Sequence, residues 1–326
     1  MHDEVVKLVA GLRDAQPILH HYRMSNFSEK VRLILDFKGL QWLSVEIPST
    51  APKPDYEPLT AGYRRTPALQ IGADVFCDTR LIADVLEAIA PVPTLFPGDI
   101  DRHRALADAL RPWAESALLW PIALDATGHH AERLGLTFHH DRARLHRRSP
   151  PSIAQVQAAG ERARARWKPQ LRWVNGLLAD GRRFLEGDAA GLVDFTVYPS
   201  LWFMEAVEGP HTRFDQHPET VAWMRRIAGL RRPAPDALSP VDALARAQSC
   251  PPIAIEPCPP PPRTDASEYR LALGEAVWVA PHDEDAPARG TLVRWSEGLI
   301  TIRTDSPRVG AVHVHFPTWG YRIRAL

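Results

Sequence analysis

The sequence lacks the features that mark several classes of protein. It contains three cysteines, Cys77, Cys250 and Cys258, and no Cys-x-x-Cys pair, so neither a disulfide framework nor a thiolate metal site is expected. Positive and negative side chains balance at 39 each, which leaves no overall charge to attract nucleic acid or an anionic membrane. No window approaches the ~18 apolar residues of a membrane span, and residues 1–15 are unlike a signal peptide. We therefore expect a cytoplasmic protein that binds neither nucleic acid nor membrane.

A serine-rich turn followed by a helix is the most informative stretch of the chain. An apolar run over residues 17–22 predicts a strand, Ser25 and Ser28 are good helix-capping residues, and the apolar face of residues 31–37 predicts a helix that Gly39 ends. Ser28 lies nearer the helical pattern and is the expected cap. A helix whose first N–H groups open into a polar turn is an anion-binding site.

The rest of the first hundred residues continues as a small α/β domain. A second strand follows the helix, so a right-handed crossover and a parallel pair of strands are expected. A long loop with four prolines comes next, and a loop of that length inside a compact domain is typically functional. A hairpin and a helix capped by Asp78 and Thr79 complete the domain. The expected strands are residues 42–47, 66–71 and 75–77, with the loop over residues 48–66 and the last helix over residues 81–89.

Three further regions follow this domain, which is predicted to span residues 1–98. Residues 99–237 carry a helical pattern throughout, and residues 238–268 form a proline-rich linker. Residues 269–326 alternate apolar and polar side chains between turns, which predicts a small β-barrel-like module. Its expected strands are residues 275–280, 290–295, 299–304, 309–316 and 321–324.

Three motifs, SNFSEKVRLILDFKGL, RRTPALQIG and CDTRLIADVLE, together resemble the N-terminal domain of cytosolic glutathione transferases of the serine type. The resemblance implies a thioredoxin-like N-terminal domain, an all-helical second domain and a homodimer. In the second domain, Asp194 corresponds to a helix-capping aspartate of the family, although Gly191 replaces the usual Ser or Thr three positions earlier. The C-terminal β module lies outside the family pattern.

The resemblance gives Ser25 the catalytic role. Glutathione has a thiol pKa of ~8.5, and lowering it by ~2 units requires ~2.7 kcal/mol of selective thiolate stabilisation. A hydrogen bond to a charged group contributes ~1.5 to 3 kcal/mol and a helix N-terminus ~0.3 to 1, so one hydroxyl before a helix suffices. The alternatives are a plain helix cap at Ser25 and a catalytic hydroxyl on Tyr22. Asn26 replaces the proline that usually follows the serine.

Two residue pairs correspond to the remaining walls of a glutathione site. Thr66 precedes Pro67, where the family has a cis proline whose preceding backbone binds the cysteinyl part of glutathione. Asp78 and Thr79 correspond to the acidic and hydroxyl residues that hold the γ-glutamyl ammonium and carboxylate. Read without the resemblance, Thr66 and Pro67 belong to an edge strand, and Asp78 and Thr79 are a common helix cap.

Basic residues beside these walls are candidates for the glycyl carboxylate of glutathione. Arg65 aligns with a basic residue that has this role in some classes of the family, and Lys53 in the long loop is a second candidate. A solvated arginine is the alternative for Arg65.

Histidines are frequent in two places, but the sequence predicts no metal site. One group lies in a polar stretch with no cysteine or regularly spaced carboxylate, and two strand histidines do not complete a ligand set. The first group is His129, His130, His139, His140 and His146, and the second is His313 and His315.

The sequence therefore predicts a glutathione transferase-like enzyme that uses glutathione as co-substrate. It would conjugate or add the glutathione thiolate to a small hydrophobic electrophile. The alternative is a non-catalytic binding or scaffold protein with the same fold that acts through its C-terminal β module.

Overall fold

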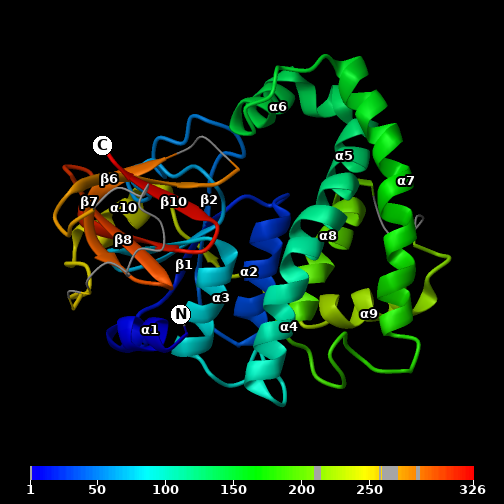
Figure 1. Cartoon of the computed structure of the whole chain (residues 1–326), viewed down its shortest axis with the longest axis horizontal. Helices are drawn as coiled ribbons and strands as arrows, with labels where there is room; N and C mark the ends of the chain where they lie inside the picture. Colours follow the sequence, from blue (N-terminus) through cyan, green and yellow to red (C-terminus); the bar gives the residue numbers. More distant parts are fainter. Residues whose placement is uncertain (1, 209–213, 257, 259–270, 284–286) are drawn as a thin grey trace.

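A thioredoxin-like α/β domain forms the centre of the molecule, between a helical domain and a set of C-terminal strands (Figure 1). The computed structural model describes residues 2–208, 214–256, 258, 271–283 and 287–326. In the N-terminal domain β1 pairs parallel with β2, and β3 forms a hairpin with β4, as predicted. Strand β1 also pairs antiparallel with β3. The elements are α1 (His2–Leu8), the 3-10 helix η1 (Val9–Leu12), β1 (Ile18–His21), α2 (Asn26–Phe37), β2 (Leu43–Glu46), β3 (Ala68–Ile71), β4 (Asp74–Cys77) and α3 (Thr79–Ile89).

The second domain is helical, as its pattern predicted. Its elements are α4 (Ile100–Pro112), the π-helix η2 (Trp113–Leu118), α5 (Leu119–His129), α6 (Ala131–Leu145), α7 (Ile153–Leu177), α8 (Leu192–Glu208) and α9 (Pro218–Ala228). Helix α8 packs against α2, which joins the two domains.

Asp194 anchors the start of α8 in the core of the helical domain. Its buried carboxylate accepts hydrogen bonds from the backbone N–H groups of Leu185 and Gly191 at 2.8 and 2.9 Å and from the indole of Trp223 at 2.7 Å. At Gly191, a Cβ atom would lie 3.2 Å from the backbone oxygen of Leu95. Close packing therefore favours glycine where the family prefers Ser or Thr, and the N–H of Gly191 keeps one bond of the capping pair.

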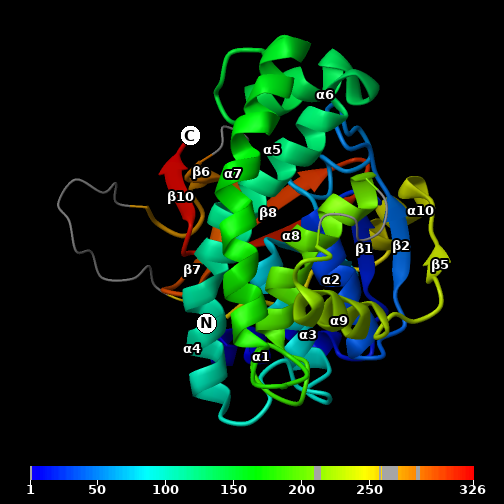
Figure 2. The same ribbon diagram turned by 90° about the vertical axis from the view of Figure 1, so that its right-hand side faces the viewer.

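The C-terminal strands do not stand apart from the N-terminal domain. Strand β9 (Gly310–Pro317) pairs parallel with β4. Among the described residues both regions therefore share a sheet of ten strands in the order β10-β6-β7-β8-β9-β4-β3-β1-β2-β5. Figure 2 shows β5 and β10 at opposite sides of the molecule. The predicted module of five strands is present and continues the central sheet. The other strands are β5 (Asp236–Ala237), β6 (Ala276–Pro281), β7 (Ala288–Trp295), β8 (Leu299–Ser306) and β10 (Tyr321–Ala325).

The stretch predicted as a proline-rich linker contains a helix, α10 (Pro240–Gln248). Ser239 caps it, and Pro240 occupies the first turn, where a missing N–H is harmless. Ala243 and Leu244 are buried in the core that covers one face of the sheet. Part of this linker, residues 257 and 259–268, and the first two residues of the predicted module lie outside the described residues. The domain boundaries stay a prediction.

Two hydrophobic cores lie on the two faces of the sheet. One contains the buried faces of α2 and α3 and continues into the helical domain, and the other lies between the opposite face, α10 and the C-terminal strands. In the described part of the chain, no helix combines the length and the apolar composition that crossing a bilayer requires.

Candidate functional site at one edge of the sheet

The predicted site residues lie close together at the edge of the central sheet where β1 and β4 end and β3 begins. His20 of β1 lies opposite Ala68 of β3, and Ala68 lies opposite Cys77 of β4. The turn after β1, the residues before β3 and the residues after β4 therefore lie side by side. Helices α2 and α3 both begin at this edge, so two helix N-termini, which favour anions, face the same region.

Ser25 caps α2, and this corrects the prediction that Ser28 does so. The Ser25 hydroxyl oxygen accepts a hydrogen bond of 3.1 Å from the backbone N–H of Ser28. Ser28 lies one turn later in the helix, is fully buried, and its hydroxyl has no partner among the described residues. The bond from Ser28 uses one lone pair of Ser25, so the Ser25 hydroxyl hydrogen remains available to donate to an anion.

The rival hydroxyl, that of Tyr22, already has a partner from the helical domain. It accepts a hydrogen bond of 3.3 Å from Arg142 of α6, and Arg142 also donates to the backbone oxygen of Ser49 at 2.9 Å. These contacts join α6 to the turn after β1 and to the long loop. They favour an anchoring role for Tyr22, and they place a guanidinium group next to the candidate site.

Thr66 and Pro67 are joined by a cis peptide bond, as the resemblance implies. The ammonium group of Lys53 donates to the hydroxyl of Thr66 at 2.8 Å and to the backbone oxygen of Arg64 at 3.0 Å. Lys53 is 2% exposed. This burial, together with the guanidinium groups of Arg142 and Arg64, lowers the pKa of Lys53 to about 7. An anion bound beside it would favour the charged form.

Asp78 and Thr79 occupy the start of α3. Asp78 caps this helix through a hydrogen bond of 2.9 Å from the N–H of Arg80, and its φ is +78°, a conformation that is costly for a residue other than glycine. Such strain is most often found at binding sites. Thr79 is the buried first residue of α3, and its N–H is one of the groups at a helix start that have no partner within the helix.

The C-terminal strands add residues to this site that sequence reasoning missed. The hydroxyl of Tyr321, at the start of β10, donates to Asp78 at 3.3 Å and lies 2.7 Å from the hydroxyl of Tyr63. Asp283, just after β6, pairs with Arg65 at 2.5 Å. No local signal marked Tyr321 or Asp283, because each acts across more than two hundred residues of sequence.

The predicted residues differ in whether the C-terminal strands hold them. Ser25, Thr66, Pro67, Asp78 and Thr79 line the sheet edge, and Lys53 reaches it by a direct contact with Thr66. Arg65 lies at the same edge, but it is held by the C-terminal strands through Asp283.

Cys77 is the nearest thiol, and its environment excludes it as a nucleophile. It is fully buried in β4, and burial raises its pKa well above the ordinary value.

Comparisons with known proteins agree with this arrangement. Residues 19–94 match the family described as Glutathione S-transferase, N-terminal domain, and residues 157–226 match Glutathione S-transferase, C-terminal domain. A search of curated proteins found no match.

Solved structures match either almost all of this chain or about two thirds of it. A GST-like protein from Pseudomonas syringae is 31% identical to this chain, covers 96% of it with the whole of its own length, and superposes with a TM-score of 0.73. A glutathione S-transferase from Sinorhizobium meliloti (19% identity, TM-score 0.53) covers 67% of this chain with 90% of its own length, and one from Rhodospirillum rubrum (21%, 0.51) covers 67% with 89%. The latter two show the shared fold. Because the match to the Pseudomonas protein takes in the whole of that protein and almost all of this chain, the chain belongs to the glutathione S-transferase family.

Proposed function

We propose that this protein is a glutathione transferase that joins the sulfur of glutathione to a small apolar electrophile. The observation that carries the proposal is the meeting of two helix N-termini with the hydroxyl of Ser25 at one sheet edge. The reaction forms a bond between sulfur and carbon. Either a leaving group departs with its electron pair, or an activated double bond accepts the thiolate and then a proton.

Each part of glutathione has a proposed partner at this edge. The Ser25 hydroxyl donates to the thiolate, and the start of α2 adds the favourable field of a helix N-terminus. Asp78 accepts from the γ-glutamyl ammonium, and the N–H and hydroxyl of Thr79 hold the γ-glutamyl carboxylate. The backbone at Thr66 and Pro67 binds the cysteinyl part, in the manner of an added strand.

Lys53 is the proposed partner of the glycyl carboxylate. It is buried in contact with Thr66, whereas Arg65 is paired with Asp283, so Lys53 replaces Arg65 as the first candidate. Among the described residues the Lys53 ammonium hydrogen-bonds to Thr66 and Arg64, and no ion pair to a carboxylate is seen. A bound carboxylate would therefore supply an anionic partner and raise the Lys53 pKa above about 7.

In this proposal the two domains have different roles. The N-terminal domain, residues 1–98, would bind glutathione, and the helical domain, residues 99–237, would close over the electrophile through α6. Met24, which is 41% exposed, precedes Ser25 in the turn, and the half-buried Phe27 lies in the first turn of α2. Both side chains offer apolar surface to an electrophile. A homodimer in the cytoplasm belongs to the same proposal.

Calorimetry and a conjugation assay test the proposal together. We expect the protein to bind glutathione at millimolar concentration and to conjugate an activated aryl chloride. Ser25→Ala should lower kcat by about 100-fold if the hydroxyl supplies ~2.7 kcal/mol. Ser28→Ala is the matched control, because the Ser28 hydroxyl is buried inside α2 and has no hydrogen-bond partner among the described residues.

A scaffold protein with this fold would neither bind nor conjugate glutathione in these experiments. The contacts of Tyr321 with Asp78 and of Asp283 with Arg65 favour the enzyme over the scaffold, because they direct the C-terminal strands to the proposed glutathione site. The scaffold function would be favoured if calorimetry shows no heat with glutathione and no conjugation occurs. The full chain should then also bind a protein partner in stoichiometric amount.

A further inference from the structure

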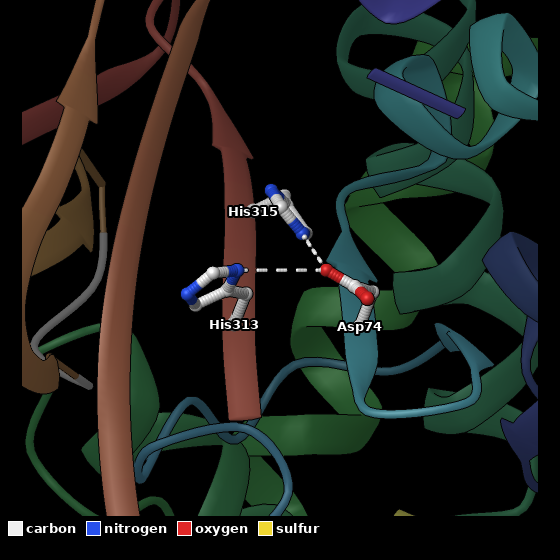
Figure 3. A group of neighbouring side chains, drawn as sticks. All are labelled: Asp74, His313 and His315. Atoms are coloured by element: carbon white, nitrogen blue, oxygen red, sulfur yellow. Dashed lines mark hydrogen bonds and ion pairs between the residues drawn. The ribbon is translucent and has the colours of Figure 1, made fainter. Parts of the chain in front are cut away.

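A buried group of two histidines and one aspartate lies where the C-terminal strands join the N-terminal sheet. In the parallel pair of β4 and β9, Asp74 lies opposite His313 and Phe76 lies opposite His315. Alternate residues of a strand share a face, so all four side chains lie on the same side of the sheet. Figure 3 shows both imidazole rings directed toward the carboxylate of Asp74.

One atom from each of Asp74, His313 and His315 lies close to the other two. Asp74 Oδ1 lies 2.9 Å from His315 Nε2 and 3.7 Å from His313 Nδ1, and the three atoms lie within 4.8 Å of one another. Asp74, His313 and His315 are 1%, 7% and 0% exposed. His313 Nδ1 has no hydrogen-bond partner in the described part of the chain, although it is directed at a carboxylate.

Outer contacts orient two of these side chains. The hydroxyl of Thr301 lies 2.9 Å from His315 Nδ1, and Phe76 stacks on the His315 ring with centroids 4.6 Å apart. The backbone N–H of Ile253 donates to the second oxygen of Asp74 at 2.9 Å. In metal sites, partners of this kind fix the tautomer of the ligating histidine and the direction of the carboxylate.

Charge favours a cation at this place. Within the described residues, no lysine or arginine forms an ion pair with Asp74; its pairs are with His313 and His315. A buried carboxylate without a cation is costly. Arg303 is on the neighbouring strand β8, but its guanidinium pairs with Asp305.

A cavity gives access to the cluster. It has a volume of about 620 Å³ and is lined by His313, by Arg303 and by residues 248–255. It has room for an ion to enter and for water to complete the coordination of the ion.

We propose that Asp74, His313 and His315 bind one divalent first-row transition ion, with zinc as the preferred metal. Two imidazoles, one carboxylate and a water form a common zinc donor set. The atoms need to move by less than about 1 Å to reach zinc bond lengths of ~2.0 to 2.2 Å. His315 would bind through Nε2 while its Nδ1–H donates to Thr301, and His313 would bind through Nδ1.

The competing explanation is a hydrogen-bond chain from Asp74 through His315 to Thr301, without a metal. That chain accounts for His315, but it leaves the buried His313 Nδ1 without a function. His313 therefore distinguishes the two explanations. A bound ion would tie β4 to β9 and stabilise the folded protein by mass action.

The test uses full-length protein without a polyhistidine tag, stripped of metal with a chelator. Zinc is titrated against a chromophoric chelator, and Co²⁺ serves as a spectroscopic probe. We expect one ion per chain, a visible spectrum of four-coordinate Co²⁺, and an affinity at least about tenfold lower in His313→Ala and in Asp74→Asn. His282→Ala is the matched control, because His282 is exposed and lies in the turn directly after β6.

Thermal unfolding provides a second reading. Zinc should raise the midpoint of the natural protein and of His282→Ala, and at the same zinc concentration it should raise that of His313→Ala less. Without metal, His313→Ala should melt within a few degrees of the natural protein, since His313 Nδ1 makes no hydrogen bond. If the natural protein binds no zinc, or if Asp74→Asn and His313→Ala bind zinc as tightly as the natural protein does, the cluster is a hydrogen-bond chain and the proposal is wrong.

Discussion

The two walls of the candidate glutathione site are built in different ways. The wall at Ser25 comes from one local segment, in which a strand, a turn and a helix follow each other within twenty residues. The wall at Asp78 also depends on Tyr321, which belongs to strands that are absent from the family pattern. The first wall should therefore control the chemistry of the thiol, and the second should allow the C-terminal strands to influence glutathione binding.

The largest effect is expected at the first wall. Ser25→Asp keeps a side chain that caps α2, but it removes the hydroxyl donor and places a negative charge beside the thiolate. We expect kcat for conjugation to fall by more than about 100-fold while the protein stays folded. Steady-state kinetics and circular dichroism check both parts, and an active Ser25→Asp enzyme would remove the chemistry from this wall.

At the second wall, Tyr321→Phe should weaken glutathione binding about fivefold without lowering kcat. The change removes a donor to Asp78 and the contact with Tyr63, worth about 1 kcal/mol. Calorimetry and the separate values of KM and kcat measure the effect. Tyr198→Phe is a control outside this edge, in α8. Equal effects of the two substitutions would show that the C-terminal strands do not tune the site.

Lys53, between the two walls, should make proton uptake on glutathione binding depend on pH. Its pKa of about 7 in the free protein means that it is mostly neutral at pH 8, and a bound carboxylate raises that pKa. Binding of S-methylglutathione, which has no ionisable thiol, should then take up a proton at pH 8 and less than that at pH 6. Calorimetry in buffers of different ionisation enthalpy measures the uptake.

The matched variant for this experiment is Lys53→Met, which keeps the length of the side chain and removes the charge. It should bind S-methylglutathione without proton uptake. Uptake that persists in Lys53→Met would assign the proton to another group.

The smallest effect is expected at Asn26. The structure places it at the first position of α2, where proline is well tolerated. Asn26→Pro should raise stability by up to about 0.5 kcal/mol and leave conjugation unchanged. Chemical denaturation measures the stability change. A large loss of activity would mean that the asparagine side chain itself takes part in the first wall.

Local patterns predicted those parts of the fold that local physics determines. The strands near residues 275–324 lie within a few residues of their expected positions, because alternation and turn residues mark each strand. The motifs at Ser25, Pro67 and Asp78 meet at one edge as a thioredoxin-like order requires. The choice between Ser25 and Ser28 as cap failed because two capping residues lay within one turn of each other.

Contacts between distant segments were beyond sequence reasoning. The pairing of β9 with β4 joins residues separated by more than two hundred positions, and it brings Asp74 to His313 and His315. The same docking places Tyr321 on Asp78. Gly191 is a smaller example, because only the structure shows the backbone oxygen of Leu95 that a side chain there would meet.

The thiol pKa of bound glutathione tests the central claim most directly. Ultraviolet difference titration of the complex should give an apparent pKa about 2 units below the ordinary ~8.5 in the natural protein and in Ser28→Ala. In Ser25→Ala it should return most of the way toward ~8.5. A thiol that titrates at the same pH in the natural protein and in Ser25→Ala would contradict the role proposed for Ser25.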